Sequence, residues 1–323
     1  MDKPVTIVSR QSPLAVAQAV AVRAMLGRAA SVPEDDWEAA FPIKTYVTVG
    51  DTNLQSSLAD VGGKGLFVKE IEAALINGEA QIAVHSMKDM PAEMPPGLVQ
   101  AAVPPREDPR DAFVTLDGHG LEAMPEGARI GTSSVRRAAQ LKRRRPDTDV
   151  VPFRGNVGTR LEKLRRGEAM GTFLAQAGLN RLGHDEVRRT PIAPEMMLPA
   201  LGQGVLCIQT REDDPDARSL CAAISCPDTE ITSSIERAFL ARLDGSCRTP
   251  MAGLAQKTGD GIRFRAEILS LDGSLAESHD DTFEVDTSDR ERAIADCASY
   301  GRSVADELFA RAGEGLKQAL GHG

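Results

Sequence analysis

The chain lacks every cysteine pattern that would make a metal site or a disulfide framework. Its five cysteines are Cys207, Cys221, Cys226, Cys247 and Cys297, an odd set without a C-x-x-C pair. This spacing argues against a zinc ribbon, a redox-active pair and a secreted disulfide scaffold. No cluster of His, Asp and Glu with ligand spacing accompanies them, so we expect no metal. We therefore predict reduced thiols.

Long hydrophobic runs and aromatic residues are also scarce. Nowhere do about eighteen apolar residues follow one another, and the start of the chain has no signal-peptide pattern. Aromatic residues are only 4% of the chain, so basic residues have few rings beside them for stacking bases. The 323 residues, 41% hydrophobic and 26% charged, predict a cytoplasmic protein of two or three domains. Nothing demands an oligomer, and we expect a monomer.

Positive charge is concentrated in one segment of an acidic chain. The net charge is −9, yet residues 136–189 carry 14 Lys and Arg against six Asp and Glu, which is +8 there and −17 elsewhere. A local basic surface inside an acidic protein indicates a polyanion bound in one place. For Arg143 to Arg145, and for Arg165 and Arg166, solvent-exposed cations at helix C-terminal ends are an equal alternative.

Short apolar runs alternate with amphipathic helical segments, the pattern of α/β domains with largely parallel sheets. At three places a predicted strand is followed by small polar residues and an arginine as a helix begins: residues 9–13, 130–137 and 150–157. Backbone N–H groups and the positive helix end make such junctions natural sites for carboxylates or phosphates. At the first junction we expect Ser12 to cap a helix that starts at Pro13.

The strand and helix pattern restarts after the first third of the chain, and Leu198–Ile208 is typical of a hinge followed by a buried strand that returns to the first sheet. We predict three domains. The first comprises residues 1–105 and 203–224, the second is the basic domain 106–202, and the third is an α+β domain, 225–323, with a frayed end from about residue 313.

Two further motifs carry candidate chemistry in the first domain. Lys64 lies in a glycine-rich segment that lacks P-loop spacing; it can reach an anion or belong to a solvated lid. Lys88 and Asp89 follow a buried strand, where neighbours in extended chain face opposite ways. Asp89 suits a general acid or base, or a group that stabilises a cation, and the plainer alternative is a turn cap. We expect His85 to be a hydrogen-bonded core histidine.

Cys247 lies where an amphipathic helix ends in a Gly-Ser-Cys-Arg-Thr-Pro loop. Arg242 and Arg248 would favour its thiolate, and the open loop would give access. Such a thiol suits a nucleophile or a covalent anchor. The plainer alternative is a small, buried apolar side chain.

Taken together, these motifs closely resemble the porphobilinogen deaminase family, also called hydroxymethylbilane synthase. Six motifs carry the resemblance in the family's order over about residues 7–255: 62–67, 85–89, 106–113, 131–137, 154–160 and 236–250. The resemblance implies two periplasmic-binding-protein-like, doubly wound α/β lobes and a small C-terminal α+β domain that bears the cysteine.

The resemblance also implies an activity. The family deaminates four porphobilinogen molecules, joins them head to tail and releases the linear tetrapyrrole hydroxymethylbilane. It carries a dipyrromethane cofactor, made from two porphobilinogen units, as a thioether on the cysteine that matches Cys247. Each pyrrole bears an acetate and a propionate, so the growing chain is a polycarboxylate, which an arginine-rich segment suits.

Residue roles follow by analogy. Asp89 would be the catalytic carboxylate, assisting loss of ammonia and stabilising the resulting cation. Cofactor binding is implied for Cys247, Lys88, Asp89, Ser134, Arg136 and Arg137, and substrate binding for Arg10, Ser12, Asp51, Lys64, Arg154, Arg160 and Arg181.

The sequence departs from the family pattern at two places in the second domain. Gly171-Thr172 stands where Asp-Ala is usual, and Asn180 stands where Lys is usual. These departures predict a less rigid strand and the loss of one cation near the chain-binding site.

Two other classes of function remain as alternatives. A non-catalytic two-lobed module that binds small carboxylates would have the same fold, but the Cys247 loop argues against it. Nucleic-acid binding through the basic segment lacks a stacking motif. The expected partner is a small molecule, porphobilinogen, with no nucleic acid and no membrane.

Overall fold

The computed structural model describes residues 3–48, 68–243, 249–259 and 261–319. Asp51, Lys64 and Cys247 lie outside the described residues. The chain divides into two compact units, one of Met1–Glu107 with Val205–Glu230 and the other of Asp108–Gly204 with Ile231–Gly323. Each unit contains a five-stranded mixed sheet, and the second also contains a three-stranded sheet.

The sheet of the first unit has the strand order β2-β1-β3-β10-β4. Strands β1, β2 and β3 are parallel, and β10 is antiparallel to both of its neighbours. The elements are β1 (Ile7–Arg10), α1 (Pro13–Ala29), η1 (Glu34–Asp36), α2 (Trp37–Ala40), β2 (Ile43–Tyr46), α4 (Lys69–Ile76), β3 (Ile82–Ser86), η2 (Met87–Asp89), β4 (Leu98–Ala102), β10 (Leu206–Arg211) and α8 (Pro215–Ala222).

The alternation of side chains along β1 explains why helices cover both faces of this sheet. Ile7 packs with α1 and α8 on one face, and Val8 packs with α4 on the other. As predicted, Ser12 caps α1 by accepting a hydrogen bond from the Ala15 amide, and Pro13 is the first helical residue. The Ser12 cap, Pro13 and the buried side chains on both faces of β1 thus fix where β1 ends and α1 begins.

The sheet of the second unit has the order β7-β6-β8-β5-β9. Strands β6, β7 and β8 are parallel, whereas β5 is antiparallel to β8 and β9. Its elements are β5 (Asp111–Thr115), η3 (Leu121–Ala123), β6 (Arg129–Gly131), α5 (Val135–Arg144), β7 (Asp149–Val151), α6 (Val157–Arg165), β8 (Gly171–Ala175), α7 (Gln176–Arg181) and β9 (Arg189–Pro191).

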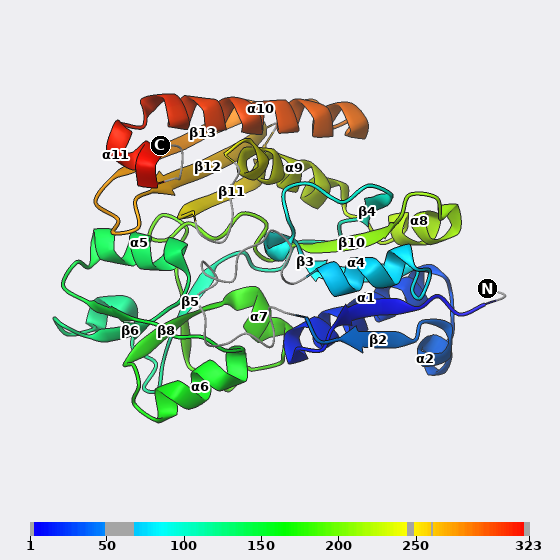
Figure 1. Cartoon of the computed structure of the whole chain (residues 1–323), viewed down its shortest axis with the longest axis horizontal. Coiled ribbons are helices and arrows are strands. Elements are labelled where there is room, and N and C mark those ends of the chain that lie inside the picture. The colour runs from blue at the N-terminus through cyan, green and yellow to red at the C-terminus, as the bar shows by residue number, and fades with distance from the viewer. Residues whose placement is uncertain (1–2, 49–67, 244–248, 260, 320–323) are drawn as a thin grey trace. The chain divides into compact units, whose positions relative to one another are not determined.

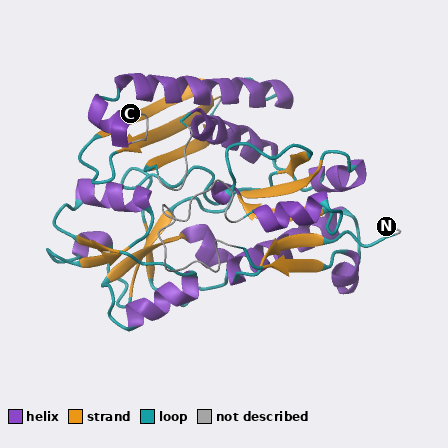
Figure 2. Cartoon of the chain, viewed as in Figure 1, coloured by secondary structure: helices purple, strands orange, loops and turns teal. Residues whose placement is uncertain are grey.

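The two five-stranded sheets share a double crossing of the chain. Strands β1 to β4 lie in the first sheet, β5 to β9 in the second, and β10 returns to the first. The return of the segment after Leu198 as a buried strand is therefore confirmed. So is the fold class, two doubly wound α/β lobes followed by a smaller α+β domain, as the helices and strands of Figure 2 show within each unit.

The C-terminal part of the second unit is an antiparallel three-stranded sheet with two long helices on one face (Figure 1). Phe239 and Leu308, from the two helices, pack on Phe264 and its same-face neighbours. The elements are α9 (Pro227–Arg242), β11 (Met251–Thr258), β12 (Gly261–Leu269), β13 (Ala276–Glu284), α10 (Arg290–Arg311) and α11 (Glu314–Ala319). The frayed end expected from about residue 313 is wrong for α11, because Leu316 is buried in this core.

Close contacts join the C-terminal sheet to the preceding lobe within the second unit. Gly273, in the β12–β13 turn, lies so close to α5 that a Cβ there would be 2.2 Å from the Ala139 carbonyl oxygen. The Gly253 amide donates to the Pro199 carbonyl at 3.0 Å, and Leu201 packs in the C-terminal core. Contacts therefore group the predicted second and third domains in one unit, and their separate boundaries stay a prediction.

The Gly171-Thr172 departure is accommodated by its surroundings. A Cβ at Gly171 would lie 2.3 Å from Cζ of the buried Phe113 ring. The Thr172 hydroxyl donates to the Gly131 carbonyl at 2.7 Å, so the added polar atom is hydrogen-bonded. Both residues lie in β8, which pairs with β5 and β6.

We predict that Gly171→Ala lowers the free energy of unfolding by about 1–3 kcal/mol, because the methyl group overpacks the Phe113 ring. Gly158→Ala is the matched control, since its Cβ would meet only the Asn156 side chain, at 3.6 Å, and a helical Gly→Ala change gains up to about 1 kcal/mol. Denaturant unfolding of both variants measures the difference. Equal stabilities would contradict the packing argument.

Candidate functional site

In the first unit, the carboxyl ends of the parallel strands β1 and β3 bring an arginine and an aspartate together. Arg10 Nη1 lies 3.9 Å from Asp89 Oδ2, with the two side chains 21% and 33% exposed. Ser12 and Lys88 lie in the same two strand-to-helix junctions. Because ligands of open α/β sheets bind at the carboxyl ends of strands, this edge is the candidate reactive site of the unit.

The backbone around Asp89 differs from the expected extended chain. Residues 87–89 form the short 3₁₀ helix η2, with the Met90 amide donating to the Met87 carbonyl. The direction of Lys88 and Asp89 is therefore set by a turn and not by strand alternation.

Three buried polar side chains of the same unit are linked by hydrogen bonds. The carboxamide of Gln209 donates to Glu72 Oε1 at 3.1 Å, which leaves its oxygen to accept from His85 Nε2, also at 3.1 Å. Burial lowers the pKa of His85 to about 4, and burial raises the pKa of Glu72. The prediction that His85 is a satisfied core histidine is confirmed, and it is neutral near pH 7.

In the second unit, the parallel strands β6 and β7 each end at a capped helix. Ser134 caps α5 by accepting from the Arg137 amide at 3.4 Å, and Asn156 caps α6 by accepting from the Thr159 amide at 2.9 Å. The sequence predicted an arginine at each junction, and Arg136, Arg137 and Arg154 are found there.

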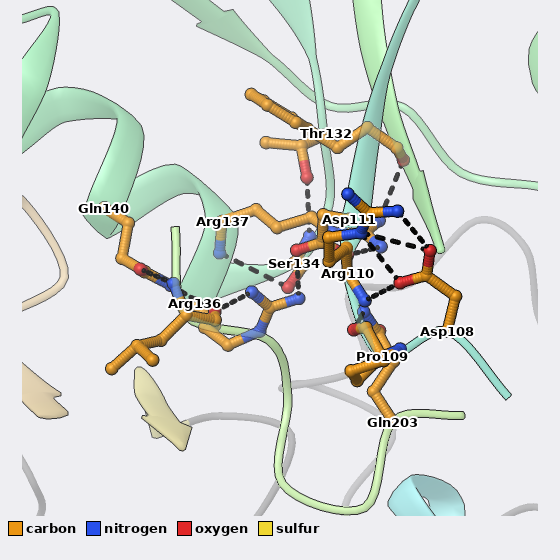
Figure 3. Close-up of polar contacts among 12 residues, drawn as sticks. Asp108, Pro109, Arg110, Asp111, Thr132, Ser134, Arg136, Arg137, Gln140 and Gln203 are labelled. Carbon is orange, nitrogen blue, oxygen red and sulfur yellow. Dashed lines mark hydrogen bonds and ion pairs between the residues drawn. The ribbon is translucent and has the colours of Figure 1, made fainter. Parts of the chain in front are cut away.

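Arg136 and Arg137 are almost fully buried and share one carboxylate (Figure 3). Arg136 Nη2 lies 2.8 Å from Asp111 Oδ2, and Arg137 Nη2 lies 2.7 Å from Asp111 Oδ1. Each guanidinium also donates to a main-chain carbonyl, from Arg136 Nη1 to Leu198 at 2.7 Å and from Arg137 Nη1 to Phe173 at 2.8 Å. Both side chains are thus fixed at two points.

Asp111 is completely buried, so its charge depends on these partners. Burial by itself raises the pKa of Asp111, but Arg136, Arg137 and a hydrogen bond from Gln203 outweigh it and hold the pKa well below the usual range. Sequence reasoning missed this residue as a functional one. A carboxylate at the start of the otherwise apolar strand β5 was the available signal, because a buried charge needs a partner.

The same lobe has a strongly positive region around Arg160. Its Nε donates to the Gly155 carbonyl at 2.9 Å. Burial lowers the pKa of Arg160 to about 10, and repulsion from Arg137 and Arg154 adds to the effect. Arg160 thus stays charged near pH 7, and an anion would relieve its repulsion from the two neighbouring guanidinium groups. Arg181, on α7, donates from Nη2 to the Gly204 carbonyl at 2.8 Å.

Other arginines of the basic segment have structural partners. Arg165 and Arg166 are about two-thirds exposed and pair with Glu162, which supports the alternative of exposed cations at a helix end. Three more pair or hydrogen-bond at the end of α5: Arg143 with Glu267, Arg144 with the Glu195 carbonyl and Arg145 with Asp147. The basic segment therefore has two parts, one at the strand ends and one at the helix ends.

At the second departure from the family pattern, another cation lies beside Asn180. The Asn180 Oδ1 accepts from Gln176 Nε2 at 2.8 Å and from Arg189 Nη2 at 3.2 Å. The guanidinium of Arg189 thus occupies the neighbourhood where the family usually has a lysine.

Over the described parts of the chain, no group of three or more His, Cys, Asp or Glu could hold a metal ion. Within the same residues, no helix is both long and apolar enough to span a bilayer.

The fold and these strand-end residues define an α/β protein with an acid in one lobe and a cluster of arginines suited to carboxylates in the other. Comparison with known proteins makes the assignment specific. The family model "Porphobilinogen deaminase, dipyromethane cofactor binding domain" matches residues 5–219, and "Porphobilinogen deaminase, C-terminal domain" matches residues 231–310. The chain belongs to the porphobilinogen deaminase family.

Curated relatives match nearly the whole chain. The porphobilinogen deaminase of Paracoccus denitrificans is 50% identical over 96% of this chain and 95% of its own length. Those of Nitrobacter winogradskyi and Caulobacter vibrioides are 47% and 44% identical over 96% and 97% of this chain, and 94% and 97% of their own. Among solved structures, the VFT2 domain of Bordetella pertussis BvgS has 15% identity and a TM-score of 0.39 over 69% of this chain and 85% of that one, too low a likeness to carry an argument.

We predict a pH-dependent loss of stability from His85. Its pKa is about 4 when folded and about 6.5 when unfolded, so between these values the unfolded chain binds more protons and stability falls as the pH falls. From pH 7.5 to 5, the parent should lose about 2 kcal/mol more than His85→Gln, which has no proton to bind. Denaturant unfolding at both pH values measures this, and parallel losses in the two proteins would contradict it.

Proposed function

We propose that this protein catalyses the family reaction with Asp89 as its catalytic carboxylate. The reaction is that of a transferase: it deaminates and polymerises four porphobilinogen molecules into hydroxymethylbilane. Family membership over nearly the whole chain supports the reaction. The placement of Asp89 beside Arg10, at the carboxyl ends of two parallel strands, supports the site.

The chemistry of the second unit fits a ligand with several carboxylates. Arg154 follows β7, Arg160 lies in α6 and Arg181 is the last residue of α7, and the pKa of Arg160 is lowered by burial and by its positive neighbours. Guanidinium groups bind carboxylates through paired hydrogen bonds, which favours arginine over lysine here. We assign these three residues to substrate and chain carboxylates, with Arg10, Ser12, Asp51 and Lys64 as further substrate-binding residues.

The residues present also fit a dipyrromethane cofactor. Among the described atoms, Arg137 Nε is buried without a hydrogen-bond partner, so the arginine pair retains a donor that a ligand carboxylate can satisfy. We assign Arg136, Arg137, Ser134, Lys88 and Asp89 to cofactor binding and Cys247 to its covalent attachment. When bound, the cofactor supplies the terminal pyrrole carbon to which the next porphobilinogen is coupled.

Asp89 would act on protons and positive charge. A carboxylate oxygen there can accept a pyrrole N–H hydrogen bond, stabilise positive charge on the ring as ammonia leaves, and receive the ring proton after coupling. Arg10, 3.9 Å away, offers a neighbouring guanidinium for a substrate carboxylate. The proposed acid–base group thus lies in the first unit, and most of the assigned arginines lie in the second.

The alternative of a non-catalytic module that binds small carboxylates is weaker, because the chain matches both domains of an enzyme family. A binding module would need neither Asp89 as an acid or base nor a modified cysteine. A monomeric state, a cytoplasmic location and the absence of nucleic-acid binding stay predictions from the sequence.

We predict that the full chain, expressed in a porphyrin-making host, carries an adduct of two pyrrole units. Intact-protein mass spectrometry measures it, and peptide mapping should place it on Cys247. A Cys247→Ser variant should fold and lack the adduct, because a hydroxyl is the poorer nucleophile. A folded parent protein that lacks the adduct would count heavily against the proposed enzymatic activity.

We predict that Asp89→Ala folds normally but loses turnover by at least about 100-fold, the usual scale for removing a general acid or base. Hydroxymethylbilane formation and thermal unfolding measure the two effects. Asp117→Ala is the control, because it removes a carboxylate from an exposed turn beside His119. Near-parental turnover in Asp89→Ala would remove Asp89 from its proposed role.

A further inference from the structure

The geometry around Asp111 indicates a role beyond neutralising charge. Consecutive helical residues point about 100° apart, so Arg136 and Arg137 have no intrinsic tendency to meet the same group. In this structure both guanidinium groups converge on the two oxygens of Asp111. Figure 3 shows both arginine side chains turned toward this carboxylate, which therefore helps to determine where they point.

Asp111 is itself oriented by Gln203. The Gln203 Nε2 donates to Asp111 Oδ1 at 2.8 Å and to the Pro109 carbonyl at 2.8 Å, so one amide group holds both the side chain and the backbone before β5. Gln203 is buried, and its neighbours Gly202 and Gly204 have φ of +73° and +86°. These conformations favour glycine and fix the turn that aims the Gln203 side chain.

The turn at residues 202–204 is itself held by a hydrogen bond to helix α9. Glu236, a buried residue of α9, accepts from the Gly202 amide through Oε2 at 2.6 Å and from the Ala255 amide through Oε1 at 2.8 Å. Hydrogen bonds thus run from α9 through the 202–204 turn to Asp111 and on to Arg137, and an ion pair joins Asp111 to Arg136. Every member lies in the second unit.

Charge neutralisation alone would not need this arrangement. One ion pair for each arginine would satisfy the electrostatics, yet both guanidinium planes are also fixed by main-chain carbonyls, those of Leu198 and Phe173. Rigid orientation of this kind lowers the entropy lost when a ligand carboxylate binds. The arrangement is that of a prepared binding site.

We propose that Asp111, oriented by Gln203, is a positioning residue that holds Arg136 and Arg137 in the geometry that binds the carboxylates of the dipyrromethane cofactor. Asp111 acts through the arginines and does not itself touch the cofactor. The inference rests on the proposed cofactor-binding role of Arg136 and Arg137.

The first test is Gln203→Met, which keeps the length of the side chain and removes its donor. The Asp111–arginine ion pairs remain, so the protein should fold. We expect the fraction of chains carrying the Cys247 adduct to fall at least threefold. The KM for porphobilinogen should rise about tenfold, the scale of a lost hydrogen bond to a charged group, while kcat changes less than threefold.

Thr148→Val is the matched control. Thr148 is also buried in the same lobe, and its hydroxyl donates to the Arg145 carbonyl at 2.8 Å beyond the C-terminal end of α5, whereas Arg136 and Arg137 lie in the first turn of that helix. It should lower the melting temperature and leave KM within twofold of the parent. If both variants lose only thermal stability and keep parental KM and adduct fractions, the positioning role is wrong.

A second variant, Asp111→Asn, removes the charge and keeps the shape. If it folds, its adduct fraction and KM should be affected more than those of Gln203→Met, and parental values would overturn the proposal. If it fails to fold, Gln203→Met decides alone. The parent protein distinguishes a failure of the proposed function from a failure of this inference. A parent protein that forms neither the adduct nor hydroxymethylbilane contradicts the proposed function. An active parent whose Gln203 and Asp111 variants keep parental KM and adduct fractions contradicts only the positioning role of Asp111.

Discussion

The buried carboxylate of Asp111 between Arg136 and Arg137 is the interaction on which the second unit depends. An unpaired charge in a protein interior costs several kcal/mol, so all three groups must stay together once the sheet and α5 have packed. The requirement ties the start of β5 to the first turn of α5. Because the arginines also donate to the Phe173 and Leu198 carbonyls, the same ion pairs also tie in β8 and the segment before β10. One ion triad thus fixes the place where four parts of the chain meet.

Both lobes contain a five-stranded mixed sheet, but they differ in the charged side chains that follow their strands. In the first, Arg10 is the last residue of β1 and Asp89 is the last residue of η2, which follows β3, and burial keeps His85 uncharged near pH 7. In the second, Arg137, Arg154 and Arg160 stand close enough to oppose one another's charge. This repulsion lowers the stability of the folded lobe until an anion binds, so the free energy of folding and the affinity for carboxylates are linked. A polycarboxylate product suits an arginine-rich lobe, because guanidinium groups bind carboxylates through paired hydrogen bonds.

Features set by a few neighbouring residues could be predicted from the sequence. The cap at Ser12 follows from a short-range hydrogen bond, and the return of the chain as β10 follows from an apolar run after a glycine-rich segment. What depended on distant partners could not be predicted. Asp111 and Arg137 are separated by 26 positions, and Arg143 meets Glu267 across 124. The turn at Asp89 was foreseen only as the plainer alternative to extended chain, because a 3₁₀ helix as short as η2 leaves no periodic pattern in the sequence.

The departures from the family pattern show how such a site tolerates change. Gly171 has no side chain where a Cβ would strike Phe113, and the hydroxyl of Thr172 finds the Gly131 carbonyl. Asn180 carries no charge, yet it holds Arg189 beside it. Thr172 and Asn180 thus each have a hydrogen-bond partner within their own lobe. A group of several arginines can lose or move one cation and still be positive, whereas one carboxylate, that of Asp111, contacts both Arg136 and Arg137. Variation is therefore more easily accommodated at the rim of the arginine cluster than at Asp111.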